Sequence, residues 1–240
     1  MPLPELRPFR VTANRPLAEE AYELVLEPAD EKPMFSFIAG QWVMMHLLSP
    51  DGTSWGRAAF SIATAPTESK QSLELAIKIY GDFTKRAHGL KEGDLVNLQG
   101  PYGVFTLRPG TDPLILFSGG IGVTPLRSML REMALTNDPR QVVHFYSNKS
   151  PAATSYLAEL RDLEREHPNL KTVFVYTRES SSEPHEEGRL TREMMARYVT
   201  DFSSAQYFMC GPNPFMDAIK MILEAEGVDC KARLHKERFS

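Results

Sequence analysis

A glycine-rich segment in the second half of the chain has the residue types that a phosphate site needs. Residues 114–117 are all apolar, which predicts a buried strand, and Gly119, Gly120 and Gly122 follow closely. Glycines permit a tight turn and let the backbone approach a ligand. Thr124 and Pro125 fit the N-cap and the first position of a helix. Because a helix N-terminus attracts negative charge, the segment predicts a site for nucleotide phosphates.

Pro125 distinguishes this turn from the common dinucleotide fingerprint. It stands where that fingerprint has its third glycine. The segment therefore indicates a dinucleotide-like ligand in a protein other than an ordinary Rossmann dehydrogenase. A turn that merely joins a strand to a helix is the alternative interpretation.

The bulk composition argues against several classes of protein. A net charge of −4 gives no indication of a nucleic-acid-binding surface, and no apolar run approaches the length of a membrane span. The first residues lack the pattern of a secretory signal, so we expect a cytoplasmic protein. Cys210 and Cys230 are too few for a disulfide framework, a four-cysteine zinc site or an iron–sulfur cluster. The histidines show no metal-binding spacing, so no metal is expected.

The first half of the chain alternates apolar and polar residues in short runs that are separated by turn residues. This period is that of half-buried strands. The spacing predicts an antiparallel six-stranded β-barrel, with one short helix at residues 84–90. The predicted strands cover residues 9–11, 22–26, 42–47, 60–62, 73–79 and 95–98.

After Pro109, strand patterns alternate with helix patterns. Predicted strands at 114–118, 142–147, 171–176 and 206–210 alternate with predicted helices at 125–135, 151–166, 191–199 and 213–226. Ser150 and Pro151 fit the start of the second helix, and Gly227 fits the end of the last one. This order predicts an α/β domain with a parallel sheet covered by helices. We expect a first domain at residues 1–109 and a second at 110–240.

Several short motifs occur in order along the chain. They are GQW at 40–42, RAAFSIA at 57–63, GDFT at 81–84, GPYG at 100–103, the glycine turn, CGP at 210–212 and ERF at 237–239. With this set of motifs, nearly the whole chain resembles the ferredoxin–NADP⁺ reductase superfamily. The resemblance implies an FAD-binding barrel followed by a domain that binds a nicotinamide nucleotide.

The resemblance assigns roles to individual residues. Ser61, Cys210 and Glu237 are implied as catalytic residues, with the Ser61 hydroxyl near flavin N5 and the other two beside the nicotinamide. The ring of Phe60 is implied on one flavin face and that of Phe239 on the other. Further flavin contacts are expected at Arg57, Ile62, Ala63, Ile77, Ile79, Gly81, Phe83 and Thr84. Contacts to NAD(P) are expected at Gly119, Gly120, Gly122, Thr124, Pro125, Thr177, Arg178, Arg189, Cys210, Gly211 and Pro212.

One departure from the family pattern concerns the flavin phosphate. The family has an arginine three residues before the serine, where this chain has Ala58, and Arg57 lies one residue earlier. One residue along a strand moves a side chain to the other face. Either a β-bulge re-aims Arg57, or the phosphate is held mainly elsewhere. The candidates are the helix start at 81–84 and the charge of Lys85 or Arg86. The resemblance favours FAD over FMN.

The choice between NADPH and NADH depends on residues near the adenosine ribose. An acidic residue after the second strand of the parallel sheet would favour NADH, but residues 147–149 are Ser, Asn and Lys. Thr177 and Arg178 follow the third strand, where NADP-using members of the family often carry a Ser-Arg pair. Arginine can bind a 2′-phosphate bidentately, and Arg189 is a second candidate. We therefore expect NADPH, with NADH as the alternative.

These observations predict a flavin-dependent oxidoreductase. Hydride would pass from NAD(P)H to bound FAD, and electrons would then pass to an acceptor such as ferredoxin, flavodoxin or an oxygenase component. Two alternatives stay open. One is a flavin reductase that uses flavin as a released substrate, and the other is an electron-transfer subunit that is active only within a complex.

Overall fold

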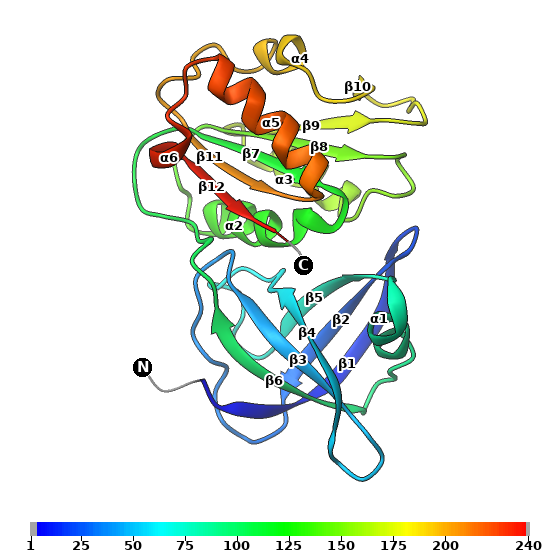
Figure 1. The fold of residues 1–240 in the computed structure, drawn as a ribbon. Helices are drawn as coiled ribbons and strands as arrows, with labels where there is room; N and C mark the ends of the chain where they lie inside the picture. Colours follow the sequence, from blue (N-terminus) through cyan, green and yellow to red (C-terminus); the bar gives the residue numbers. More distant parts are fainter. Residues whose placement is uncertain (1–3, 239–240) are drawn as a thin grey trace. The chain divides into compact units, whose positions relative to one another are not determined.

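The computed structural model describes residues 4–238 and divides into two compact units. Unit 1 contains the described residues up to Leu107 together with Arg127–Thr136. Unit 2 contains Arg108–Leu126 and the described residues from Asn137 onward. The N-terminal half of the chain is rich in strands, whereas strands and helices alternate in the C-terminal half (Figure 1).

Unit 1 is built on a six-stranded antiparallel sheet. Its strands are β1 (Leu6–Ala18), β2 (Ala21–Pro28), β3 (Trp42–Leu48), β4 (Ser54–Ser61), β5 (Leu73–Lys78) and β6 (Leu95–Tyr102). They pair in the order β4-β3-β6-β1-β2-β5. Just after β4, the Ala63 N–H donates to the Glu74 carbonyl of β5 over 2.9 Å, which brings the two edges of the sheet together. The predicted six-stranded antiparallel domain is confirmed.

The alternating pattern places apolar side chains on the inner face of this sheet. Phe9 and Val11 of β1 and Leu24 and Leu26 of β2 are completely buried. Burying a side chain of this size stabilises the fold by about 1.5–3 kcal/mol. A register slip by one residue would expose all of them at once, so the pattern fixes the pairing.

Helix α1 (Gly81–His88) begins earlier than the predicted start at residue 84. Gly81 has φ +75°, a left-handed conformation that glycine adopts without strain, so the chain turns from β5 directly into the helix. The Thr84 hydroxyl accepts from the Tyr80 N–H at 2.6 Å and donates to the Tyr80 carbonyl at 2.7 Å. The hydroxyl of Thr84, in the helix start named as a candidate site for the flavin phosphate, is therefore engaged by the backbone.

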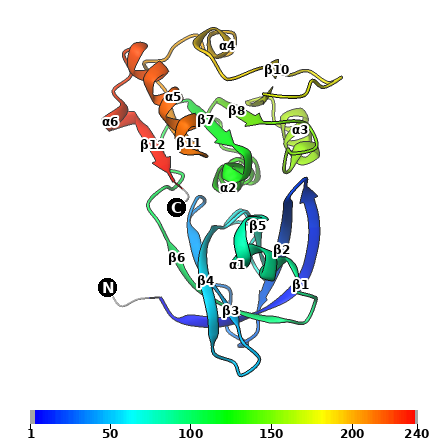
Figure 2. The same ribbon diagram turned by 45° about the vertical axis from the view of Figure 1, so that its right-hand side comes forward.

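Unit 2 is a parallel sheet with helices on both faces. Its strands, β7 (Leu114–Gly119), β8 (Val142–Asn148), β9 (Leu170–Tyr176), β10 (Glu186–Glu187), β11 (Gln206–Cys210) and β12 (Leu234–Glu237), pair in the order β10-β9-β8-β7-β11-β12. Helices α3 (Leu157–Glu166) and α5 (Asn213–Ala225) lie on opposite faces (Figure 2). Helices α2 (Val123–Leu135), α4 (Arg192–Ala196) and α6 (Cys230–Arg233) complete the chain. The predicted parallel α/β architecture is confirmed, while β10, α6 and β12 were not predicted.

The predicted start of α2 at Thr124 and Pro125 is wrong. A 3₁₀ turn over Gly120–Gly122 runs straight into the helix, which begins at Val123. The Thr124 hydroxyl donates to the Ile121 carbonyl at 2.7 Å, so it does not cap the helix as an acceptor. Pro125 lies in the first turn, where its missing N–H leaves no helical hydrogen bond unmade.

The predicted start of α3 at Ser150 and Pro151 is also wrong. The Ser150 hydroxyl accepts from the Ala153 N–H at 3.2 Å and so caps a turn instead. Tyr156 has φ +59°, which interrupts helical geometry, and α3 begins only at Leu157. Among the described helices, none combines the length and the apolar character needed to cross a membrane.

Strands β7 and β8 share a buried polar pair. His144 Nε2 and Ser118 Oγ lie 2.7 Å apart, and both side chains are completely buried. Burial lowers the pKa of His144 from 6.5 to about 3, because charging an imidazole away from water is costly. His144 is therefore neutral in the folded protein at neutral pH.

The burial of His144 predicts that the protein loses stability in acid and that this loss depends on His144. Below its ordinary pKa of 6.5, His144 binds a proton in the unfolded chain but not in the folded chain until about pH 3. The free energy of unfolding should therefore fall by about 1.4 kcal/mol per pH unit over this window. His144→Gln should remove about 2 kcal/mol of the loss between roughly pH 6.5 and 5, measured by urea unfolding.

The control for this prediction is His167→Gln, in the loop before β9, which should keep the acid-dependent loss. A pH slope that stays the same in His144→Gln would show that the buried imidazole does not cause the loss.

Candidate functional site

The glycine turn packs directly against the end of β11. A methyl group on Gly122 would lie 2.2 Å from the Cys210 carbonyl oxygen, so only glycine permits this approach. On the other side of the turn, a methyl group on Gly211 would lie 3.0 Å from the Gly119 nitrogen. Gly120 has φ +54°, and the space beside its Cα is open. The turn therefore combines a fixed backbone with open space, as a phosphate cradle requires.

Cys210 and Glu237 stand side by side at the carboxyl ends of β11 and β12. They are register partners, and Ser118 is the partner of Cys210 on β7. Burial raises the pKa of the Cys210 thiol, and the nearby Glu237 carboxylate raises it further. The thiol is therefore protonated, which suits a group that shapes a pocket and not a nucleophile. Pro212 lies beside Gly119, so the CGP motif and the glycine turn form one structure.

The ends of β8 and β9 bring several cationic residues into one region. The Arg178 N–H donates to the Lys149 carbonyl at 3.0 Å, and the Thr177 hydroxyl donates to the last residue of β8 at 3.2 Å. The Gly188 N–H donates to the last residue of β9 at 2.8 Å, which places Arg189 next to the same strand end. Lys149, Arg178 and Arg189 are all exposed. Sequence reasoning did not single out Lys149, although it lies in the segment that lacks an acidic residue.

Phe60 and Ser61 form the end of β4 in unit 1. Ser61 is buried, while Phe60 is partly buried against the core. The pairing with β3 is regular along this part of β4, and the one register shift lies before it, next to Leu47. Within this strand pair, therefore, no bulge separates Arg57 from Ser61. Alternation then places Arg57 on the face opposite to Phe60, and Ala58 on the Phe60 face.

Arg57 is the neighbour of His46 across the β3–β4 pair. The pKa of His46 is lowered by burial and, to a smaller extent, by the positive charge of Arg57. The structure thus places the Arg57 charge beside an imidazole and away from the Phe60 face.

Several residues expected to contact flavin belong to the core of unit 1. Ile62, Ala63 and Ile77 are completely or almost completely buried, and Ile79 packs against the same core. The buried side chains of Ile62, Ala63 and Ile77 pack in the core, so any contact of these three residues with a ligand comes from the backbone. Phe83 differs, because its ring lies 6.0 Å from that of Phe60 between centroids. Phe239 lies outside the described residues.

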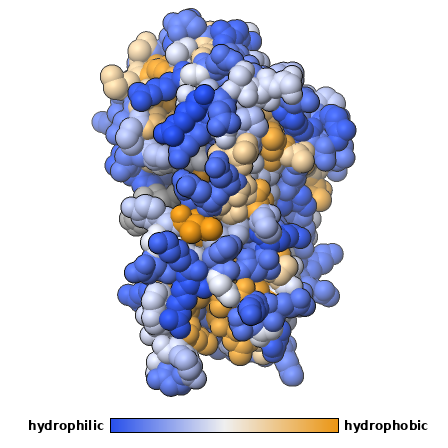
Figure 3. Space-filling view, turned by 90° about the vertical axis from the view of Figure 1, so that its right-hand side faces the viewer, coloured by the Kyte–Doolittle hydropathy of each residue, from blue (hydrophilic) through white to orange (hydrophobic). Residues whose placement is uncertain are grey.

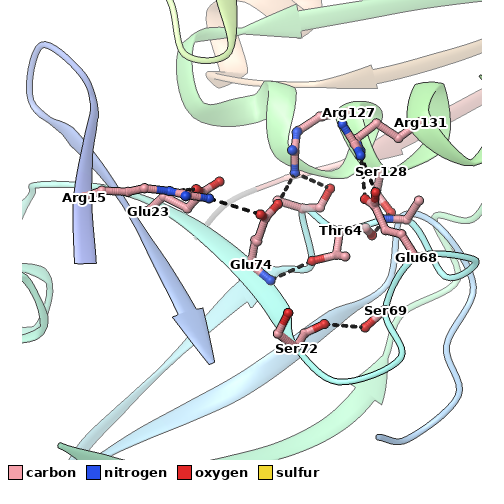
Figure 4. A network of polar contacts seen from close by, with 12 residues as sticks. Arg15, Glu23, Thr64, Glu68, Ser69, Ser72, Glu74, Arg127, Ser128 and Arg131 are labelled. Atoms are coloured by element: carbon pink, nitrogen blue, oxygen red, sulfur yellow. Dashed lines mark hydrogen bonds and ion pairs between the residues drawn. The ribbon is translucent and has the colours of Figure 1, made fainter. Parts of the chain in front are cut away.

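A buried arginine of α2 holds the segment that follows Ser61. Arg127 Nη1 donates to the Ala63 carbonyl at 3.0 Å and to the Glu74 carboxylate at 2.6 Å. The Ser128 hydroxyl donates to the Thr64 carbonyl at 2.6 Å. Both α2 side chains point toward this segment (Figure 4). The backbone that follows Ser61 is thus fixed by α2.

The same helix holds the next residues of this segment. Arg131 forms an ion pair with Glu68, and although burial opposes it, hydrogen bonding from Arg131 keeps the pKa of Glu68 below its usual value. Glu132 accepts from the Thr67 hydroxyl at 2.8 Å. This network of hydrogen bonds and ion pairs was not predicted from the sequence. The one sequence feature that could have indicated it is a charged residue, Arg127, within the apolar part of the helix. No cluster of His, Cys, Asp or Glu within residues 4–238 is arranged to hold a metal.

Two families match successive parts of the chain. Residues 8–107 match the oxidoreductase FAD-binding domain family, and residues 116–221 match the oxidoreductase NAD-binding domain family. The first range contains the Phe60–Ser61 strand end and α1. The second contains the glycine turn and the CGP motif.

Similar proteins share both parts. The chain is 32% identical over 237 residues to the reductase component of propane 2-monooxygenase from Mycolicibacterium smegmatis, covering 95% of this chain and 66% of that protein. A cytochrome P450 reductase structure from Amycolatopsis has 26% identity and a TM-score of 0.83, covering 98% of this chain and 71% of that one. The flavohem-like FAD/NAD-binding domain of a Vibrio cholerae nitric oxide dioxygenase shares the fold, with a TM-score of 0.88, 24% identity and coverage of 97% and 98%. The chain spans about two thirds of the length of the propane 2-monooxygenase reductase relatives.

The approach of Gly122 to β11 predicts a specific cost for a single methyl group. In Gly122→Ala the new methyl would overlap the Cys210 carbonyl oxygen, at 2.2 Å, so the turn must move. We expect the affinity for NADP⁺, measured by equilibrium dialysis, to fall at least about tenfold and the unfolding free energy to fall by roughly 2–4 kcal/mol. Gly120→Ala points into open space and should cost only about 1–2 kcal/mol of stability for its left-handed backbone. Equal stability losses in the two variants would contradict this explanation.

The Arg127–Glu74 pair predicts a non-additive double mutant. Removing one partner of a buried ion pair leaves an uncompensated charge, so Arg127→Met should destabilise unit 1 by roughly 3–5 kcal/mol and Glu74→Gln by somewhat less. The double variant should lose about 1–3 kcal/mol less than the sum. Tryptophan fluorescence during urea unfolding reports on unit 1, because both tryptophans, Trp42 and Trp55, lie in it. Simple additivity would show that the two side chains do not stabilise each other.

Proposed function

The chain belongs to the ferredoxin–NADP⁺ reductase-like superfamily of FAD- and NAD-binding oxidoreductases, and on this basis we propose that it is an NAD(P)H-dependent flavoprotein reductase. It accepts hydride from NAD(P)H and delivers electrons to a separate acceptor. The observation that supports this most is the presence of both binding domains in one chain, with the glycine turn joined to Cys210 and Glu237. We place the boundary between the two binding domains at residues 109 and 110.

The flavin site uses the end of β4 and the start of α1. A bound flavin supplies the chemistry that couples two-electron hydride transfer to one-electron donation. Phe60 would pack against the flavin ring, and Ser61 would hold the flavin near its N5. Arg127 holds the Ala63 carbonyl just beyond this serine, so the position of Ser61 is fixed by α2. The residues of this chain therefore orient the flavin, while the redox chemistry belongs to the cofactor.

The nicotinamide nucleotide site uses the carboxyl ends of β7, β11 and β12. The glycine turn binds the pyrophosphate through backbone N–H groups. Cys210 shapes the nicotinamide pocket as a neutral thiol, and Glu237 beside it orients the ring and stabilises the positive charge that develops when hydride leaves. Because Gly122 lets the turn lie against the end of β11, the site for the pyrophosphate and the pocket for the nicotinamide are adjacent.

NADPH is the preferred donor in this proposal. The three exposed cations at the ends of β8 and β9, Lys149, Arg178 and Arg189, provide positive charge for a 2′-phosphate. Arg178 can bind it through two parallel N–H groups. The segment after β8 offers no carboxylate for the ribose hydroxyls that NADH would present.

The acceptor in this proposal is a partner protein of an oxygenase system or a ferredoxin or flavodoxin. Relatives that support this include a reductase component of propane 2-monooxygenase and a cytochrome P450 reductase. The two cysteines are unpaired thiols, which suits the reducing cytoplasm that we propose as the location.

A flavin reductase that releases its flavin is the second candidate. It is favoured by the orientation of Arg57, whose charge lies on the face opposite to Phe60. Gel filtration separates the two functions, since a reductase with bound FAD keeps its yellow colour, whereas a flavin reductase loses it and reduces added flavin.

The test of the proposal is the oxidation of NADPH by the purified chain with FAD and ferricyanide, followed at steady state. We expect turnover with NADPH, and kcat/KM for NADPH should exceed that for NADH. Arg178→Gln should lower kcat/KM for NADPH by about tenfold and leave NADH within about twofold, because only NADPH has the 2′-phosphate. Arg165→Gln, which removes an exposed arginine of α3, should change neither. A chain that takes up no flavin and oxidises neither nucleotide would overturn the proposal.

A further inference from the structure

Three aromatic rings of β4 and α1 lie next to one another in unit 1. The rings of Phe60 and Phe83 lie 6.0 Å apart between centroids, and those of Phe83 and Trp55 lie 6.3 Å apart. Gly56 lies beside the Phe83 ring, since a methyl group there would be in ordinary contact with it at 3.6 Å. The three rings, which we call the aromatic row, extend from the predicted flavin face toward the start of β4.

The outer end of the aromatic row is open to solvent. Trp55 is 42% exposed, whereas Phe60 and Phe83 are partly buried against the core. Apolar side chains are visible among polar ones on the face of the molecule that carries α1 (Figure 3). Trp55 therefore extends a partly buried aromatic cluster to the solvent, where its ring face can stack on a ligand.

A positive charge lies at this open end. The guanidinium carbon of Arg86 is 4.6 Å from the centroid of the Trp55 ring, and its Nη2 is 3.5 Å from the Leu48 carbonyl. Arg86 is three residues after Phe83 on α1, so both side chains lie on the same side of the helix. Lys85 is turned by about 100° from Arg86 around the helix axis and makes no described contact with the row.

We propose that the aromatic row and Arg86 bind the adenylate half of FAD, with the adenine against Trp55 and Arg86 on the phosphate next to it. Arg86 then supplies the charge that Ala58 cannot supply and that Arg57 carries on the other face of β4. Trp55 is the residue of β4 at the register shift with β3, so strand alternation does not assign it to the face of Arg57. Phe83 links its ring to that of Phe60, so the adenine and the flavin ring would lie at the two ends of the aromatic row. The assignment rests on the proposed flavin site and makes FAD, not FMN, its ligand.

Equilibrium dialysis of FAD and of FMN against the flavin-free chain tests this assignment. The unaltered protein should bind FAD at least about tenfold more tightly than FMN. Trp55→Ala should weaken FAD binding by about tenfold, because base stacking is lost, and Trp55→Phe should restore most of it. Arg86→Gln should also weaken FAD binding by about tenfold and reduce its dependence on salt. FMN lacks the adenylate half, so its affinity should stay within about twofold in every variant.

Lys85→Gln removes the same charge one residue away and should leave FAD affinity within about twofold. Three results would overturn the assignment: unchanged FAD affinity in Trp55→Ala and Arg86→Gln, an equal loss of FMN affinity, or an equal effect of Lys85→Gln. If the unaltered protein binds neither flavin, the result contradicts both the proposed function and this assignment. If the unaltered protein binds FAD and oxidises NADPH, and the Trp55 and Arg86 variants bind FAD equally well, the result contradicts this assignment alone.

Discussion

The contact between the glycine turn and the end of β11 is the constraint on which the nucleotide-binding unit depends. The backbone of Gly122 approaches the Cys210 carbonyl so closely that no side chain fits between them. This contact sets where the first turn of α2 begins relative to the ends of β7 and β11. It also places Cys210, and through β12 its neighbour Glu237, next to the glycine turn. One backbone contact therefore links the glycine turn to the ends of β11 and β12.

The flavin-binding unit has a corresponding constraint in its polar network. The segment after Ser61 is not held by β-pairing alone, because Arg127 and Ser128 of α2 bond to its carbonyls. Glu74 neutralises the buried guanidinium and is itself held by Arg15 at 3.3 Å. A buried charge is tolerated only when it is paired, so these groups are interdependent. The position of Ser61 therefore depends on residues far from it in the sequence.

The sequence predicted the strands and the order of the two domains' elements because period-two and period-3.6 patterns reflect which side of an element is buried. It did not predict β12, because LHKE has no strand pattern and forms a strand only beside β11. It misplaced the start of α3, because Ser150–Pro151 is a good local start signal and the left-handed Tyr156 cannot be read from residue type. The glycine turn was identified, but its continuation as a 3₁₀ turn was not.

The predicted site residues also divide into features that the local sequence identified and features that it did not. Motif order located the turn, the CGP segment and the end of β4, since each consists of adjacent residues. Contacts between separate elements could not be predicted from the sequence. The face that Arg57 occupies follows from the strand register, and Arg127, Arg86 and Trp55 contact residues of other elements. Residue types alone do not encode those contacts.

An anaerobic titration of the FAD-loaded chain with NADPH, followed by the flavin absorbance, tests the proposed function most directly. If FAD and NADPH bind to this one chain as proposed, equimolar NADPH should bleach the flavin band without any added partner. A flavin band that stays oxidised in excess NADPH and in excess NADH would contradict the proposal that this chain alone transfers hydride to its flavin.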